Sequence, residues 1–138
     1  MSTYDTHSVD LSSFLRKEGL HRHFKDYTAY DIQVDVTGVI ETTLTVELAF
    51  VECKVGPITL RDVGQLLGYS LVARPVLSLL VSPRGLSDRL RSLLVTFGRQ
   101  DILGYGDGRA IRLAVWDDLR GEADLSSVRR GLHHLRDL

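Results

Sequence analysis

The residues with the clearest chemical potential are Glu52 and Lys54, which are separated only by Cys53. They end residues 43–54, a stretch that predicts a strand whose even-numbered positions are apolar up to these two charges. An unpaired charge on a core-facing position costs several kcal/mol, so each side chain needs a partner or a catalytic role. A carboxylate beside an ammonium group could bind a cation and orient a water molecule. The alternative is that the strand surfaces here and the two charges pair with each other or with solvent.

A second source of carboxylates lies upstream, in residues 31–40. This stretch alternates between apolar and polar residues, which predicts a strand with Ile32, Val34, Val36 and Ile40 on one face and Asp31, Gln33, Asp35 and Thr37 on the other. A short polar stretch at Glu41 and Thr42 joins it to 43–54, so the two form an antiparallel hairpin. Either Asp31 or Asp35 would then stand beside Glu52. Two such carboxylates suit Mg²⁺, although each Asp could equally be a solvent-facing residue.

Residues 58–73 change to a helical period after Gly56 and Pro57. Arg61, Gln65 and Tyr69 recur every four residues and therefore share one polar stripe of this helix. An amide and a phenol on one stripe could hold a phosphate or a metal-bound water. An ordinary solvated helix face is the alternative interpretation.

The remaining periodicity predicts one α/β domain over residues 1–138, with a core at about 31–116. The expected further elements are an N-terminal helix at about 11–24, a strand at 76–81, a helix at 86–98, a loop at 104–108, a strand at 110–116 and a helical tail at about 124–138. Strands joined through helices imply parallel neighbours. We therefore expect a mixed central sheet flanked by helices on both faces.

Charge is divided unevenly along the chain despite a net value of -1. Residues 1–53 carry four basic and nine acidic side chains, whereas residues 54–112 carry nine basic and four acidic ones. A polyanion-binding surface beside a carboxylate metal site would need such a separation. Cys53 is the single cysteine, and no apolar run reaches the roughly 20 residues of a membrane span. These features predict a reduced, intracellular, cytoplasmic protein that does not enter a membrane.

Taken together, Asp35, the Glu52-Cys53-Lys54 triplet and Gln65-Leu-Leu-Gly-Tyr69 resemble the motifs of the PD-(D/E)XK nuclease superfamily. The last motif is similar to the Gln-xxx-Tyr motif of its RecB-like branch, and small Holliday-junction-resolvase-like members are similar in size. The resemblance implies a restriction-endonuclease-like fold in which Asp35, Glu52 and the backbone carbonyl of Cys53 bind Mg²⁺ or Mn²⁺. Lys54 would assist the attacking water, and Gln65 and Tyr69 would support the site.

The resemblance also implies additional residues and partners. Family members often carry a Glu on a first helix, for which Glu18 is the candidate, and Asp31 competes with Asp35 for the Asp position. Arg61, Arg74 and Arg84 are candidates for binding nucleic acid. We expect metal-dependent hydrolysis of DNA, which is structure-specific if shape rather than base sequence is read. A homodimer through the apolar tail at Val128, Leu132 and Leu135 is expected, with a protein partner as another source of specificity. The alternatives are a catalytically silent nucleic-acid-binding or assembly subunit with the same fold, and a regulatory α/β domain whose motifs arise by chance.

Overall fold

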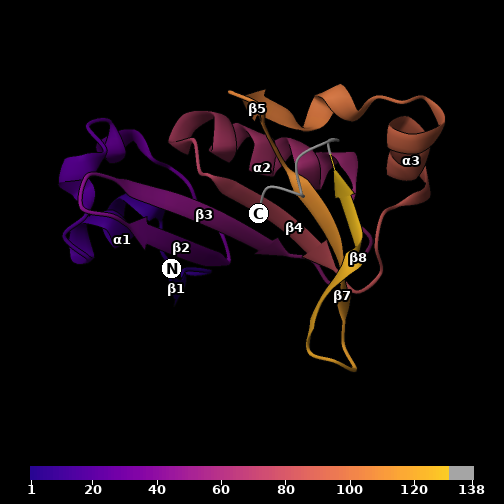
Figure 1. Cartoon of the computed structure of the whole chain (residues 1–138), viewed down its shortest axis with the longest axis horizontal. Helices are drawn as coiled ribbons and strands as arrows, with labels where there is room; N and C mark the ends of the chain where they lie inside the picture. Colours follow the sequence, from indigo (N-terminus) through magenta and orange to yellow (C-terminus); the bar gives the residue numbers. More distant parts are fainter. Residues whose placement is uncertain (131–138) are drawn as a thin grey trace.

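The computed structural model describes the backbone of residues 1–130 and the side chains of residues 1–122. Its centre is a six-stranded mixed sheet with the order β1-β2-β3-β4-β7-β8 (Figure 1). The strands are β1 (Ser2–Asp5), β2 (Val36–Glu41), β3 (Val46–Cys53), β4 (Leu77–Ser82), β7 (Arg112–Asp117) and β8 (Glu122–Arg130). The predicted α/β class with a mixed sheet is therefore confirmed.

The connections follow the predicted order in the middle of the chain. Strands β2 and β3 form an antiparallel hairpin, and β3, β4 and β7 are parallel neighbours. Helix α2 (Leu60–Ala73) connects β3 to β4. Helix α3 (Asp88–Arg91) continues into a π-helical segment, η3 (Ser92–Thr96). Both belong to the connection that leads along the chain from β4 to β7. Since parallel strands end at the same edge, the carboxyl ends of β3 and β4 lie side by side.

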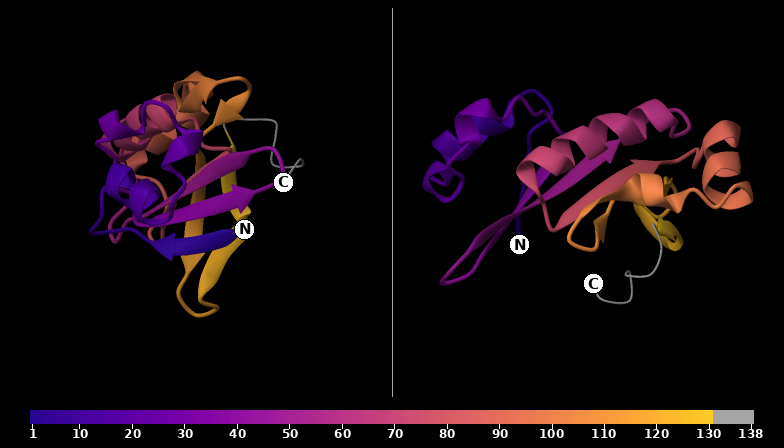
Figure 2. Two further views of the ribbon diagram at one scale, coloured as in Figure 1. Left: turned by 90° about the vertical axis from the view of Figure 1, so that its left-hand side faces the viewer. Right: turned by 90° about the horizontal axis from the view of Figure 1, so that it is seen from above.

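The helices cover one face of the sheet, so the expectation of helices on both faces is wrong for the described residues. α1 (Leu11–Lys17), α2 and α3 all lie on the same side of the sheet in the right-hand view of Figure 2. Their buried side chains join one core cluster with Leu48, Phe50, Leu80 and Leu113 of the strands. No helix among the described residues is long and apolar enough to cross a membrane.

The predicted strand at 31–40 begins later than expected, and its core-facing side is the other one. Ile32 and Val34 are buried in an extended segment before β2, but within β2 it is Thr37 and Val39 that enter the core. Thr37 can be buried because its hydroxyl forms a 2.9 Å hydrogen bond with that of Thr6. Asp35 lies two residues before Thr37 and is therefore on the same, core-facing side of the chain, where it is half-buried.

The two ends of the chain depart most from the predicted elements. β1 was not predicted, and the first helix ends at Lys17, where Gly19 adopts a φ of +71°. The tail expected to be helical from about 124 forms strand β8 through Arg130, because it pairs with β7. The side chain of Val128 and all of Leu132 and Leu135 lie outside the described residues.

Two loops also differ from expectation. Leu44 is 90% exposed in the turn before β3 and does not extend the apolar face of that strand. The expected loop at 104–108 contains β5 (Gly104–Gly106), which pairs with β6 (Arg109–Ala110) in a separate two-stranded sheet. Three short 3-10 segments complete the elements, at His21–His23, Tyr27–Ala29 and Gln100–Leu103. None of these changes the position of the β2-β3 hairpin.

Candidate active site

The hairpin register brings Asp35 and Glu52 together. Val36 pairs with Val51, so the next position along the ladder places Asp35 opposite Glu52. The backbone N–H of Asp35 donates to Oε1 of Glu52 at 2.8 Å, and the N–H of Cys53 donates to Oδ2 of Asp35 at 2.8 Å. Each carboxylate is therefore fixed by the backbone of the other strand, which limits its rotation and leaves its second oxygen for other partners.

Lys54 completes a compact charged group at the end of β3. Its Nζ atom lies 3.7 Å from Oε2 of Glu52 and 3.6 Å from Oδ1 of Asp62. Its backbone N–H donates to the carbonyl of Val81 at 2.8 Å, which ties the residue to the end of β4. The ammonium group is thus held between a strand carboxylate and a helix carboxylate.

Asp62 was missed in the sequence, although a recognisable signal marks it. Thr59 and Asp62 form a reciprocal capping box at the start of α2, in which Thr59 accepts from the Asp62 N–H and Asp62 accepts from the Thr59 N–H. The Thr-x-x-Asp spacing ahead of an apolar run predicts this box. What the spacing does not indicate is the contact from Asp62 to Lys54, which depends on how α2 packs.

The surroundings of Glu52 disfavour its ionised form. Burial raises the pKa of Glu52 above its ordinary value, and the negative charge of Asp35 raises it further. The hydrogen bond from Asp35 and the charge of Lys54 offset part of this rise. Burial and the same two carboxylates also raise the pKa of the Cys53 thiol, which disfavours a thiolate nucleophile. A cation bound between the carboxylates would relieve their repulsion.

The donor set fits a small divalent cation. Mg²⁺ keeps several of its waters and takes one or two protein carboxylates, which Asp35 and Glu52 supply, with the Cys53 carbonyl adjacent in the chain. The described residues contain no cluster of three or more His, Cys, Asp or Glu side chains suited to a metal. Asp31 is exposed four residues before Asp35, and Glu18 is the exposed C-cap of α1. No described contact joins either residue to the carboxylate pair.

Gln65 and Tyr69 lie on α2 as predicted, and they contact each other. Nε2 of Gln65 donates to the hydroxyl of Tyr69 at 3.2 Å. They share a stripe with Arg61 in the first turn of the helix, next to Asp62. No hydrogen bond joins Gln65 or Tyr69 to Asp35, Glu52 or Lys54 within the described residues.

The three predicted nucleic-acid-binding arginines do not lie together. Arg61 lies in the first turn of α2, which follows β3, and Arg84 lies in the turn after β4. Arg74 is at the opposite end of α2, about 20 Å away at the rise of an α-helix, where it pairs with Asp107. Arg89 and Arg91 of α3 were not selected, yet both are exposed, five and seven residues after Arg84, and form no ion pair with a described residue.

β1 adds a further charged pair that sequence analysis missed. Thr6 follows β1 and donates its backbone N–H to the Asp35 carbonyl at 2.9 Å, and His7 Nδ1 lies 2.6 Å from an oxygen of Asp5. The hydrogen bond to Asp5 raises the pKa of His7, the charge of Asp5 adds to this, and Asp35 makes a smaller contribution in the same direction. Because β1 was not predicted, no signal placed this pair near Asp35.

Comparison with known proteins adds no relative: no family model, no curated protein and no solved structure matches the chain.

Proposed function

We propose that this protein is a metal-dependent nuclease that hydrolyses phosphodiester bonds in DNA. The observation that carries the proposal is that two 2.8 Å hydrogen bonds fix both carboxylates, from the Asp35 N–H to Glu52 and from the Cys53 N–H to Asp35, with the Lys54 ammonium 3.7 Å from Glu52. Two fixed carboxylates and a cationic side chain at one strand edge are the groups that metal-assisted hydrolysis needs. The antiparallel hairpin, the α2 crossover and the parallel β4 also support a restriction-endonuclease-like core.

In this proposal the chain positions the reactants and stabilises charge. Asp35, Glu52 and the Cys53 carbonyl would hold the cation, which would supply Lewis-acid polarisation of the phosphate and of a water. The oxygen of the water attacks phosphorus and one P–O ester bond breaks. One proton of the water ends on the departing oxygen, and the remaining O–H stays on the phosphate and ionises to solvent. Lys54 orients that water and stabilises the negative charge that develops on the phosphate. Asp62 keeps the Lys54 side chain at the site.

The exposed arginines favour a polyanion as substrate. Arg61, Arg84, Arg89 and Arg91 all lie at or next to the strand edge that ends in Lys54, and none forms an ion pair with a described residue. Positive side chains in this position attract phosphates by releasing counterions from the nucleic acid. Asp101 and Asp107 do not neutralise them, because they pair with Arg99 and Arg74.

The test is cleavage of supercoiled, linear and branched DNA by the wild type and by Lys54→Ala, each with Mg²⁺, Mn²⁺ or EDTA. We expect metal-dependent cleavage by the wild type, a loss of at least about 100-fold in Lys54→Ala, and unchanged DNA binding. Lys25→Ala, which removes an exposed lysine between α1 and β2, is the matched control and should cut normally. Binding without cleavage of any substrate would favour the catalytically silent subunit instead.

The homodimer and the protein partner stay predictions, because the tail expected to form the interface lies largely outside the described residues. Sedimentation of the full chain at micromolar concentration tests the dimer. A monomer under those conditions would remove it from the account.

A further inference from the structure

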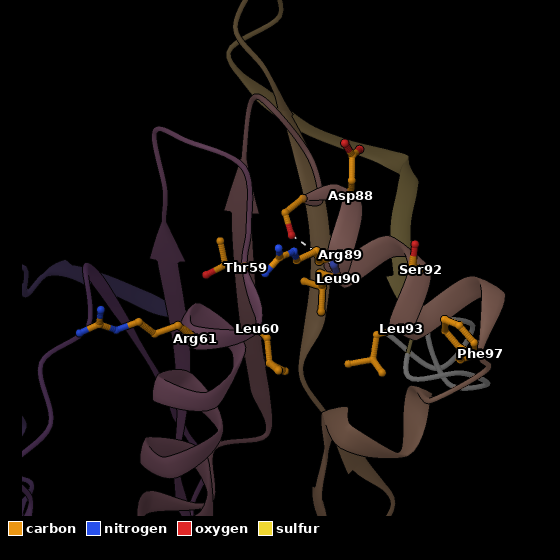
Figure 3. Close-up of a pocket in the computed structure, with 10 residues that line it drawn as sticks. Thr59, Leu60, Arg61, Asp88, Arg89, Leu90, Ser92, Leu93 and Phe97 are labelled. Atoms are coloured by element: carbon orange, nitrogen blue, oxygen red, sulfur yellow. Dashed lines mark hydrogen bonds between the residues drawn. The ribbon is translucent and has the colours of Figure 1, made fainter.

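A groove separates the start of α2 from α3 and η3, on the edge of the molecule that carries Lys54. The groove is open to solvent and has a volume of about 880 Å³. Leu60 of α2 and Leu93 of η3 point into the space between the two helices, with Phe97 at its far end (Figure 3). The groove thus has apolar walls from two separate elements.

The apolar walls are exposed to solvent. The exposed fractions are 52% for Leu60 and 71% for Phe97, while Leu90 closes the floor. A phenyl ring exposed to this degree beside a leucine is a surface that water solvates poorly. A ligand with an apolar surface of its own could cover these side chains and remove them from water.

Positive charge borders this apolar surface. Arg61 and Arg89 are among the lining residues, and Arg84 and Arg91 lie next to them in the chain segments that form its rim. Figure 3 shows Arg61 extending from α2 to the side away from α3, whereas Leu60 points into the groove. Asp88 is the only acidic residue among the described lining residues.

A flat apolar group attached to phosphates fits this combination, and an unpaired nucleotide is such a group. In a duplex the faces of the bases are stacked on one another, so only phosphates and base edges would reach the groove. An unpaired base offers a π-face to Phe97 and leaves its phosphates to the arginines, as in single-strand-binding sites that combine aromatic and basic side chains.

We propose that the groove between α2 and η3 binds unpaired nucleotides of a single strand, with a base stacked on Phe97 and a phosphate of the same strand on Arg89. The inference rests on the proposed nuclease function and specifies its substrate class. Thr59 lines the groove and forms the capping box with Asp62, whose carboxylate lies 3.6 Å from Lys54 Nζ. A strand bound in the groove would therefore run toward the carboxylate pair.

The experiment measures binding, in EDTA, of labelled single-stranded DNA and of duplex DNA of the same length. We expect the wild type to prefer the single strand, and Phe97→Ala to weaken that binding on the order of ten-fold without affecting duplex binding. Phe97→Trp retains a stacking surface and should restore it. Val95→Ala is the matched control, because Val95 is 57% exposed on the same helical segment and does not line the groove.

An oligonucleotide that carries abasic sites identifies the group that Phe97 contacts. It should bind the wild type about as weakly as the intact single strand binds Phe97→Ala, and the two changes together should have no additional effect. Equal loss of single-strand and duplex binding in Phe97→Ala, or no loss at all, would overturn the inference. These binding assays contain no metal and are independent of the cleavage assay. A wild type that binds single strands in this way but cleaves no DNA with Mg²⁺ would contradict the proposed nuclease function and leave the binding inference standing.

Discussion

Glu52 is the residue at which folding and the proposed function compete most directly. It is 9% exposed, it faces the same side of β3 as Leu48 and Phe50, and Asp35 stands opposite it. Burial and the Asp35 charge raise its pKa, so the ionised side chain opposes folding in the absence of a cation. A purely structural position would favour an apolar or neutral side chain here, which is why the carboxylate supports a functional interpretation.

Replacing that carboxylate should stabilise the metal-free protein. Because the folded-state pKa is raised, the ionised form destabilises the fold at neutral pH, and stability is gained as the pH falls through the folded pKa. In EDTA, Glu52→Gln should therefore melt a few degrees above the wild type at neutral pH, with a difference that shrinks on acidification. Thermal unfolding followed by circular dichroism measures this. A lower melting temperature for Glu52→Gln at neutral pH would contradict the electrostatic account.

At the scale of the elements, the first turn of α2 links helix stability to the position of Lys54. Thr59 and Asp62 cap the helix by reciprocal hydrogen bonds, and Asp62 also lies 3.6 Å from the lysine ammonium. One carboxylate therefore serves the helix end and the charged group. The two roles can be separated by substitution.

Thr59→Ala should lower the free energy of unfolding by about 1 kcal/mol, since it removes an N-cap hydrogen bond. Asp62→Asn preserves an acceptor for the Thr59 N–H but removes the charge near Lys54, so it should affect stability less and cleavage more. Denaturant unfolding and cleavage rates on the two variants provide the comparison. If both variants lose stability and activity in the same proportion, Asp62 has no separate role in positioning Lys54.

The elements also show what the sequence can and cannot predict. The β2-β3 hairpin follows from local alternation, α2 from its helical period, and β4 from a continuous apolar run. The core-facing side of β2 was predicted wrongly, because Thr37 is buried through a hydroxyl contact with Thr6, a residue 31 positions away. The segment that forms β8 was expected to be helical from its local amphipathic pattern. That prediction is wrong because pairing with β7 overrides the local pattern. The sequence allowed either Asp31 or Asp35 as the partner of Glu52, and the register of the hairpin in the structure selects Asp35. Asp62 approaches Lys54 only through the packing of α2, which the sequence does not indicate.

At the scale of the whole molecule, the helices lie on one face of the sheet (Figure 2), and the candidate charged site lies at one end of the parallel strands. Arg61 and Arg84, which form no ion pair with a described residue, lie in the segments that follow β3 and β4. The carboxylate pair lies at that same edge. In the proposed function, these arginines would attract a polyanion to the edge that carries the carboxylate pair.

The salt dependence of DNA binding tests this arrangement. Each phosphate contact contributes about 0.7–0.9 to the negative slope of log K against log salt. Arg84→Gln and Arg89→Gln should each reduce that slope by about this amount, whereas Arg74→Gln should leave it unchanged because Arg74 pairs with Asp107 at the far end of α2. A slope that falls equally for Arg74→Gln would place the binding surface elsewhere.

The central claim is that Asp35 and Glu52 together hold a divalent cation, and manganese binding tests it most directly. Mn²⁺ would be titrated into the full-length wild type, Asp35→Asn and Glu52→Gln, with and without a DNA oligonucleotide, and free Mn²⁺ followed by electron paramagnetic resonance. We expect saturable binding to the wild type that Mg²⁺ displaces and that either substitution removes or weakens by about ten-fold or more. Asp31→Asn, which changes the other candidate carboxylate, should bind as the wild type does. Absence of Mn²⁺ binding to the wild type in both conditions, or binding that survives both substitutions, would contradict it.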